Sequence, residues 1–431
     1  MERLIRIVYF AFLFSFILPS GSLAMIPLKS GLGLLLLFLL LLKERKTSRF
    51  TGQAIFVFIM LGLWSLLSLI NGYGTSSVSF IRSYFSLLLA AWCTFEVLEN
   101  NFVRPKEAFK AFGAVSASII ALKFLFAGGL TLGIFKVEQI VELFKTLFKT
   151  DLTTMYFPLG NITFYRLMVS NDGIPLAWFA FYMLSKKHPA KKIIWTLVIA
   201  IFSFVVYSRV ILVQFALTIV AFIFVKLLGE RRLSLSVLLK SAAVVAVVGV
   251  AAVAIISAVR PSILEGIQTR FFSNSSTASD QIRSDQIAKL TEGFLESPII
   301  GHGTGTYIQD FTRSETTPFS YEAEYLSFLY QFGILGFVLI IGTTVLGFYQ
   351  ACFKGIRSRS VRRMMVFTFL VWLAKPLFNP AFLSSNSGLI IAIAYASGKH
   401  LDKSLIKEAA LLALGMGRQD KNVMPLGQTS R

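Results

Sequence analysis

The sequence predicts an all-α, polytopic integral membrane protein with about twelve transmembrane helices. Of its 431 residues, 55% are hydrophobic and only 15% carry a charge, whereas a water-soluble protein carries about 25% charged residues. The hydrophobic residues also fall in blocks that approach the roughly 20 residues with which a helix crosses a bilayer. We therefore expect one membrane domain over residues 1–400, followed by a cytoplasmic amphipathic tail over residues 401–431.

Charged and polar interruptions set the ends of the predicted spans. The first block follows basic residues as a signal peptide would, but another apolar block begins at once at Pro27, so we expect a retained first span. In chain order the spans lie near residues 5–20, 26–42, 53–71, 78–98, 110–133, 173–185, 192–207, 210–228, 239–258, 323–349, 364–378 and 387–399.

The interruptions also assign the two sides of the membrane. Strongly basic runs follow the second, sixth, eighth and tenth spans, with the sequences KERKTSR, KKHPAKK, GERR and KGIRSRSVRR. The positive-inside rule places such runs in the cytoplasm. With twelve spans both chain ends then lie inside, and the two long polar segments, 136–172 and 260–320, lie on the outer side.

The net positive charge does not by itself indicate a nucleic-acid partner. Lys and Arg number 42 against 22 Asp and Glu, a net charge of +20, but these residues fall between the apolar blocks, where topology and anionic headgroups account for them. No soluble segment is long enough for a nucleic-acid interface, so we expect no nucleic-acid partner. Cys93 and Cys352 lie in or beside apolar blocks and are expected to be buried thiols. The three histidines lack ligand spacing and predict no metal site.

Three arginines from separate outer parts of the chain are candidate phosphate ligands. Arg209 stands at the turn between the seventh and eighth predicted spans, Arg166 lies just before the sixth, and Arg283 lies in an amphipathic stretch of the large outer segment. Guanidinium groups bind phosphate oxygens with two parallel hydrogen bonds. The alternatives are a snorkelling side chain for Arg209 and a solvated helix face for Arg283.

Two carboxylates lie where the outer segment meets the tenth span. Glu322 is a candidate general base, since a carboxylate beside apolar surface can be tuned toward the working pH. The alternative for Glu322 and Glu324 is a favourable interaction with the helix dipole. Glu324 is two positions further on, so we expect it to face another side of the helix and to matter less.

Glycines mark both sides of this junction. Gly301, Gly303 and Gly305 resemble a phosphate-binding loop only weakly, because the Lys and Ser or Thr of a nucleotide-binding loop are missing. A tight turn that returns the chain to the bilayer explains them equally well. Inside the spans, Arg82, Lys123 and Lys375 indicate a hydrated interior that tolerates anions, because an isolated charge in the bilayer is unfavourable.

These residues together carry a family resemblance. Ser208 and Arg209 precede an apolar run, Arg283 follows in the outer segment, and SPIIGHGTGTY leads into the pattern L-x-x-L-x-x-x-G-x-x-G, which ends with Gly333 and Gly336. In this order and spacing, the motifs resemble those of the O-antigen ligase and polymerase superfamily of bacterial envelope glycan enzymes. Arg166 with Asn171 is a looser match.

The resemblance implies a fold, a substrate and a location. The fold would be similar to the GT-C-type membrane fold of lipid-dependent glycosyltransferases. The substrates would be glycans carried on undecaprenyl pyrophosphate, with no metal or nucleotide cofactor. The partners would be the lipid bilayer and a chain-length regulator protein, and the site would face the periplasm from the bacterial cytoplasmic membrane.

The resemblance also assigns roles. Ligases of the superfamily have a histidine eleven positions before the glycine of the tenth-span motif, and here that position, counted back from Gly333, is Glu322. A glutamate there resembles a polymerase, in which Glu322 would take the proton of the attacking sugar hydroxyl while Arg209, Arg283 and Arg166 bind the leaving pyrophosphate. The alternatives are a ligase, a peptidoglycan polymerase, and a flippase for lipid-linked glycans that carries out no chemistry.

Overall fold

A computed structural model describes the chain in ten stretches. They comprise residues 1–19, 26–43, 49–148, 153–159, 162–185, 188–206, 208–229, 274–312, 317–377 and 380–413. The elements run α1 (Glu2–Phe14), η1 (Ser15–Ile17), α2 (Leu28–Leu41), α3 (Arg49–Ile70), α4 (Gly74–Glu99), α5 (Pro105–Thr131), α6 (Val137–Leu147), β1 (Thr153–Leu159), β2 (Ile162–Met168), α7 (Gly173–Leu184), α8 (Pro189–Val206), α9 (Arg209–Gly229), α12 (Asn274–Glu296), α13 (Glu324–Gly336), η2 (Phe337–Gly342), α14 (Thr343–Phe353), α15 (Arg359–Ala374), η3 (Lys375–Leu377) and α16 (Ser385–Ala413).

The helical membrane architecture is confirmed in outline. Helices lie on every predicted span except 239–258, which falls outside the described residues. Within the described part of the chain, five helices are long and apolar enough to cross a membrane, and Leu28–Leu41, Gly173–Leu184 and Val210–Val225 are shorter apolar helices. Those five are Phe50–Ile70, Gly74–Glu99, Pro105–Thr131, Pro189–Val206 and Glu324–Phe353. The count of twelve spans stays a prediction.

The all-α class is confirmed, and the structure adds one short hairpin to it. Strands β1 and β2 form an antiparallel hairpin, in which Thr153 pairs with Met168 and Tyr156 with Tyr165. Both strands are rich in β-branched and aromatic residues, and the sequence between them is Gly-Asn. That composition is typical of a hairpin, so a local signal existed within the polar segment 136–172.

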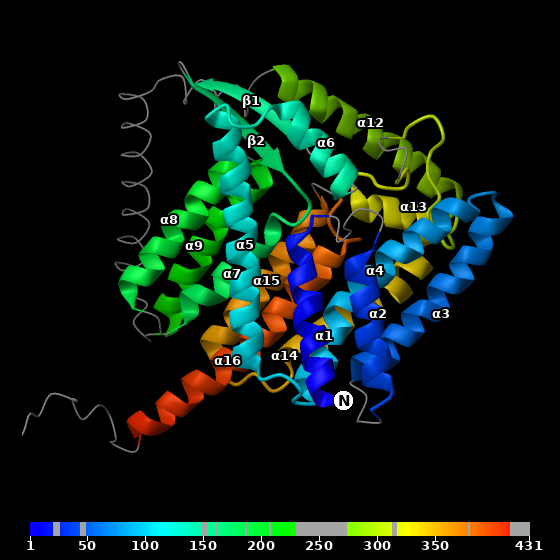
Figure 1. Cartoon of the computed structure of the whole chain (residues 1–431). Helices are drawn as coiled ribbons and strands as arrows, with labels where there is room; N and C mark the ends of the chain where they lie inside the picture. Colours follow the sequence, from blue (N-terminus) through cyan, green and yellow to red (C-terminus); the bar gives the residue numbers. More distant parts are fainter. Residues whose placement is uncertain are drawn as a thin grey trace, which may run out of the picture.

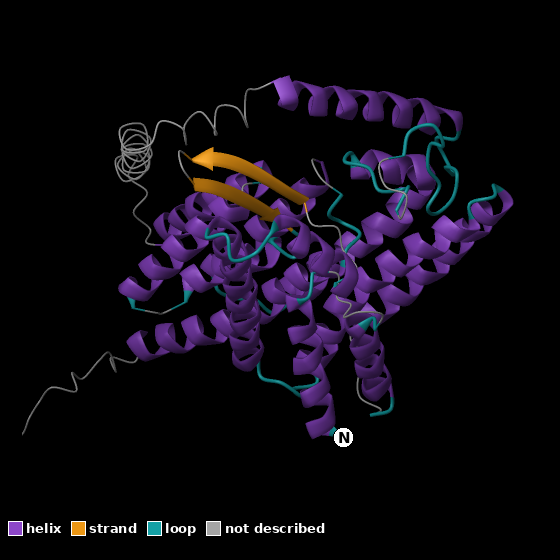
Figure 2. Cartoon of the chain, turned by 45° about the horizontal axis from the view of Figure 1, so that its top comes forward, coloured by secondary structure: helices purple, strands orange, loops and turns teal. Residues whose placement is uncertain are grey.

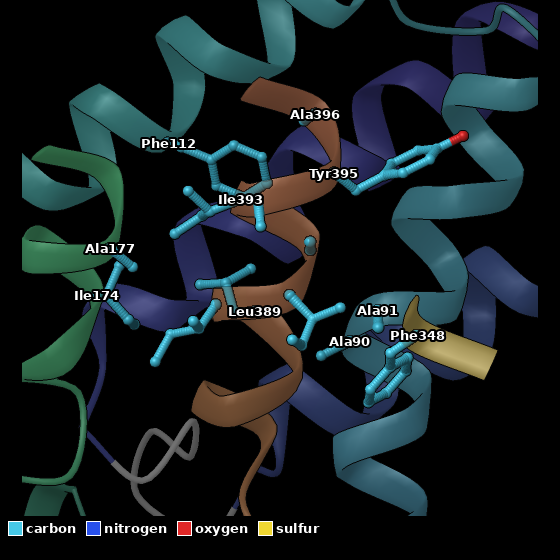
Figure 3. Close-up of a cluster of buried hydrophobic side chains, with 14 of the residues drawn as sticks. Ala90, Ala91, Phe112, Ile174, Ala177, Phe348, Leu389, Ile393, Tyr395 and Ala396 are labelled. Atoms are coloured by element: carbon cyan, nitrogen blue, oxygen red, sulfur yellow. The ribbon is translucent and has the colours of Figure 1, made fainter. Parts of the chain in front are cut away.

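Helix α16 forms the centre of the bundle. Figure 3 shows it between α7, with Ile174 and Ala177, and α4, with Ala90 and Ala91. A Cβ at Gly388 of α16 would press on the backbone carbonyl of Leu87 in α4, so a small residue allows this close approach. α16 continues to Ala413, past the expected end of the membrane domain at residue 400.

The polar segments gather at one end of the bundle. Helix α6, the β1–β2 hairpin and α12 lie across this end, whereas the N-terminus lies at the opposite end (Figure 1). Seen with this end turned forward, the hairpin and α12 extend above the helix ends (Figure 2). The arrangement agrees with placing both long polar segments on the same side of the membrane. Cys93 and Cys352 are buried free thiols, as predicted.

Candidate active site

The five motif glycines form one joint between the loop after α12 and the helix Glu324–Phe353. Gly301, Gly303 and Gly305 have φ angles of 74°, 106° and 70°, and Gly333 has φ 61° at a kink inside α13. Residues other than glycine rarely adopt these φ angles. A Cβ on Gly301 would press on the backbone of Gly333, and one on Gly333 would press on the carbonyl of Ile299. The loop and the kink therefore require each other.

Hydrogen bonds close this joint. The backbone N–H of Gly303 donates to the Gln331 carbonyl at 2.8 Å, and the N–H of Gly305 donates to Gln331 Oε1 at 2.7 Å. From the other side, the N–H of Ile334 donates to the Pro298 carbonyl at 2.8 Å. Because the loop N–H groups bond to the protein, the glycines make a structural turn rather than a phosphate cradle.

Helix α3 holds the same joint from the side. The indole N–H of Trp64 lies 2.7 Å from the Ile300 carbonyl and 3.1 Å from the Phe332 carbonyl. A Cβ on Gly336 would contact the Trp64 ring. The last glycine of the motif thus makes room for a side chain that bridges the loop and the span, which the spacing of the glycines alone did not reveal.

The structure brings the predicted base together with one of the predicted arginines. Arg283 of α12 donates from Nε at 2.9 Å and from Nη2 at 2.6 Å to the same oxygen, Oε2, of Glu322. The Glu322 and Arg283 side chains are 16% and 31% exposed, so the pair lies at the edge of solvent. These residues are 39 positions apart in the chain and meet because α12 lies over the start of α13.

Backbone contacts fix Glu322 in this position. Its N–H donates at 2.8 Å to Oε1 of Gln286, which is buried one turn along α12 from Arg283. The preceding residue, Tyr321, is also buried, and its hydroxyl accepts the N–H of Ile308 at 2.9 Å. Burial raises the pKa of the Tyr321 phenol to about 12, so it stays protonated at neutral pH. Neither Gln286 nor Tyr321 was singled out from the sequence.

His302 ties α12 to α13 further along both helices, at Gly293 and Tyr330. Its Nε2 lies 2.8 Å from the Gly293 carbonyl of α12, and its ring stacks on Tyr330 of α13 with centroids 4.6 Å apart. A Cβ on Gly293 would contact that same Tyr330 ring. The position of Arg283 over Glu322 therefore depends on the GHGTGT loop, although this loop contacts neither residue's side chain in the hydrogen bonds described.

Glu324 faces another side of the helix from Glu322, as expected. Its side chain is buried, and its carboxylate accepts the backbone N–H groups of Ala381 and Phe382 at 2.7 Å and of Leu383 at 3.0 Å. It therefore anchors the chain just before α16, a structural contact that the sequence did not indicate. The smaller effect of Glu324 on the reaction stays a prediction.

The charges inside the bundle are paired. Lys123 Nζ lies 2.8 Å from Oδ1 of Asp172, and both side chains are buried. The ammonium also donates to the Leu167 carbonyl at 2.8 Å. Lys375 interacts electrostatically with Asp172 and Glu324. This network agrees with the polar interior expected from Lys123 and Lys375, and it adds Asp172, which the sequence analysis did not single out.

Two cavities flank the segment that Glu324 anchors. One, of about 320 Å³, lies between α7, α9, α15 and α16; its lining is mainly apolar but includes Asp172, Lys375 and Ser208. The other, of about 300 Å³, has a mainly polar lining that includes Lys29, Arg82 and several serines. Residues 384 and 386 line both cavities, so the two spaces adjoin. Arg82 therefore faces a polar cavity, and its side chain is exposed.

The other two predicted arginines are placed only by their backbone. Arg166 lies in β2 opposite Met155, and Arg209 begins α9, with its neighbours Ser208 and Val210 lining the larger cavity. The structure describes the backbone of Arg166 and Arg209 but not their side chains. Their grouping with Arg283 stays a prediction.

Comparison with known proteins supports the superfamily. Residues 192–341 match the O-antigen ligase family model. The match includes Arg209, Arg283, Glu322 and all five motif glycines, and it indicates a glycosyltransferase-like membrane enzyme of O-antigen biosynthesis that uses lipid-linked glycans. No curated protein matches the chain.

Proposed function

We propose that this protein is a polymerase that joins glycan repeats carried on undecaprenyl pyrophosphate. The observation that carries the proposal is the contact between Arg283 and Glu322, which places a phosphate-binding group and a proton acceptor side by side. Both residues lie within the matched region, at the point where an outer segment meets a membrane span. A transfer from a lipid pyrophosphate needs both functions at one place.

The proposed reaction is a direct displacement. A hydroxyl oxygen of one lipid-linked repeat forms a bond to the anomeric carbon of another, and the bond from that carbon to the pyrophosphate oxygen breaks. The hydroxyl proton passes to Glu322, and undecaprenyl pyrophosphate leaves with the bonding electron pair. A single displacement inverts the configuration at the anomeric carbon.

The arginines supply the positive charge in this mechanism. Guanidinium groups bind phosphate oxygens bidentately, so Arg283, with Arg209 and Arg166 as proposed further ligands, neutralises the pyrophosphate as it leaves. This proposal assigns no role to a metal or a nucleotide. Chain ends and long glycans reach the site from the outer side, where α6, the hairpin and α12 lie together (Figure 2).

The Arg283–Glu322 contact gives the site an order of events. Two hydrogen bonds of Arg283 end on one oxygen, Oε2, of Glu322, the carboxylate that is proposed to accept the hydroxyl proton. A donor pyrophosphate competes for the same guanidinium N–H groups and draws them away. Glu322 then becomes available as a base only after the donor has bound, which limits unproductive proton transfer.

The charge pattern of the sequence and the fold together indicate where the protein is located and which side its site faces. We place the protein in the bacterial cytoplasmic membrane with the Arg283–Glu322 site toward the periplasm, because the basic runs of the sequence follow the second, sixth, eighth and tenth predicted spans, which the positive-inside rule assigns to the cytoplasmic side. A chain-length regulator protein would contact the outer segments. These assignments rest on the charge pattern and on the family.

A ligase remains the second candidate, because the matched family model carries that description. Glu322 at the position of the ligase histidine favours the polymerase. Purified protein supplied with one synthetic lipid-linked repeat separates the two. A polymerase extends the repeat into a ladder of products, whereas a ligase gives product only when a lipid A core acceptor is added, and no product under either condition would contradict both.

A further inference from the structure

A third cavity lies at the opposite end of the bundle from the Arg283–Glu322 pair. It has a volume of about 530 Å³ and is lined by residues of α5, α7, α8 and α16, which pack against one another. It opens where α5 and α8 begin and α7 ends, at the end that carries the N-terminus (Figure 1). The proposed reaction does not use this space.

Aromatic rings form the wall of this cavity. Trp178 packs against Tyr182 with ring centroids 4.8 Å apart and meets Trp195 edge-on at 5.0 Å. Phe109 of α5 stacks on Trp178 from the other side at 6.0 Å. Tryptophan and tyrosine are enriched where a membrane protein meets the headgroup region, because their rings are apolar and carry one polar group.

Three cations surround the opening. Lys106 and Lys110 lie on consecutive turns of α5, Lys191 lies in the first turn of α8, and all three are exposed. The described lining contains no carboxylate. An apolar, aromatic wall beneath a ring of ammonium groups is complementary to an amphiphile with a negatively charged head.

One buried polar group in the wall lacks a partner. The indole N–H of Trp178 is buried and makes no hydrogen bond within the described part of the chain. A Cβ on Gly113 would lie 2.9 Å from the Trp178 ring, so only glycine at that position leaves the ring where it is. A buried donor without an acceptor is rare in folded proteins, and an oxygen atom of a ligand in the cavity would provide the acceptor.

The face of α8 turned away from the cavity is exposed and apolar. Ile193, Ile194 and Leu197 are 61%, 58% and 58% exposed, whereas Lys191 and Trp195 of the same helix line the cavity. In a membrane, acyl chains cover such exposed apolar residues. The bilayer therefore reaches α8, and a lipid whose head lies at Lys191 can keep its acyl chains in the bilayer.

We propose that this cavity is a binding site for an acidic phospholipid. The lysines bind the phosphate, the aromatic wall of Phe109, Trp178 and Trp195 contacts the glycerol and the upper acyl chains, and the Trp178 N–H donates to a phosphate or ester oxygen. The site holds the ends of α5, α7, α8 and α16 together. It does not depend on the proposed reaction.

Tryptophan fluorescence tests the site, because Trp178 and Trp195 report on it directly. The protein is placed in bilayers that contain a small fraction of brominated phosphatidylglycerol or brominated phosphatidylcholine, and quenching by the bromine atoms is compared. We expect brominated phosphatidylglycerol to quench more, and the excess to fall in Trp178→Phe and Trp195→Phe. Equal quenching by the two lipids would overturn the proposal.

Matched variants identify the cause. Replacing Lys106, Lys110 and Lys191 together with Gln should abolish the excess, whereas replacing three cations at the opposite end of the bundle, Lys136 and Lys145 at α6 and Lys289 of α12, with Gln should leave it unchanged. Gly113→Leu, which fills the cavity without changing charge, should also abolish it. Persistence of the excess in the Lys106, Lys110 and Lys191 variant would overturn the proposal. Relief of the quenching by soluble glycerol phosphate would overturn it too, because the site would then bind a free anion.

Discussion

Arg283 donates two hydrogen bonds, at 2.6 and 2.9 Å, to a single carboxylate oxygen of Glu322. The two residues come from different elements, since Arg283 lies in α12 and Glu322 precedes α13. An arginine that only solvates a helix face would not point at this oxygen. The contact joins the two residues in one ion pair and defines which substitutions are informative.

Replacing Glu322 with Gln should remove the base and keep the contact. Gln retains an oxygen that accepts from Arg283, but it does not take up a proton at neutral pH. We expect chain extension in a single turnover to fall by a factor of about 100 to 10,000, with unchanged expression and unchanged binding of lipid-linked substrate. Glu292→Gln, an exposed acid on α12, is the control and should extend normally. Near-normal extension by Glu322→Gln would end its assignment as the base.

Replacing Arg283 should weaken the use of the donor. Arg283→Ala should abolish extension, and Arg283→Lys should restore little of it, because one ammonium does not reproduce two parallel N–H donors. Lys289→Ala is the matched control, since it removes a cation of the same helix whose Nζ lies over the Phe311 ring at 5.0 Å. It should keep its activity.

The double variant of Arg283→Ala and Glu322→Gln tests whether the pair acts as one unit. Residues that act together give effects that do not add, so the double variant should be about as slow as the slower single variant. If the rate reductions of the two single variants multiply in the double variant, the residues have independent roles. The proposed release of Glu322 by the donor would then be wrong.

Glu324→Gln should lower stability rather than act on chemistry. The carboxylate accepts three backbone N–H groups between residues 381 and 383, and the NH₂ group of Gln would face one of these donors. Leaving a buried donor unsatisfied costs on the order of 1–3 kcal/mol. We expect a lower unfolding temperature in detergent for Glu324→Gln than for Glu322→Gln. An unfolding temperature equal to that of the unchanged protein would contradict the anchoring role.

The side of the membrane on which α12 lies can be measured with single cysteines. Glu296→Cys should react with an impermeant thiol reagent in whole cells, because the Glu296 side chain is 68% exposed at the end of α12. Lys354→Cys, in a basic connection after α14, should react only after the membrane is opened. Cys93 and Cys352 are buried and should give little background. The reverse pattern would place the Arg283–Glu322 pair on the cytoplasmic side.

Hydropathy predicted the helices well because each span is a run of apolar residues that are neighbours in the sequence. The β1–β2 hairpin was missed because its strands are short and lie in a segment read as polar. The pairing of Arg283 with Glu322, and that of Lys123 with Asp172, joins residues far apart in the chain. A sequence pattern shows that a charge in a membrane needs a partner, but only the packing of the helices shows which partner it has.

The motif glycines also show that a sequence pattern does not reveal which distant residues are in contact. Their number and spacing indicated a turn, but not that Gly301 and Gly333 lie against each other. The helical spacing predicted that Glu324 faces away from Glu322, but it could not show which segment Glu324 anchors, because residues 381–383 are distant in the chain.

The joint between the loop and the kinked span can be tested with one added methyl group. Gly333→Ala forces a side chain onto φ 61° and ψ −176°, a conformation essentially restricted to glycine that costs roughly 1–3 kcal/mol, and its Cβ would also press on the Ile299 carbonyl. We expect a total loss of stability above about 2 kcal/mol, seen as a lower unfolding temperature. Gly62→Ala is the matched control in α3, where no atom lies within 4 Å of the added Cβ; because alanine favours helix, it should stabilise the protein by about 0.5–1 kcal/mol. Since the same loop positions α12, Gly333→Ala should also slow extension in the fraction that stays folded. Equal unfolding temperatures for the two variants would show that the loop and the kink do not support each other.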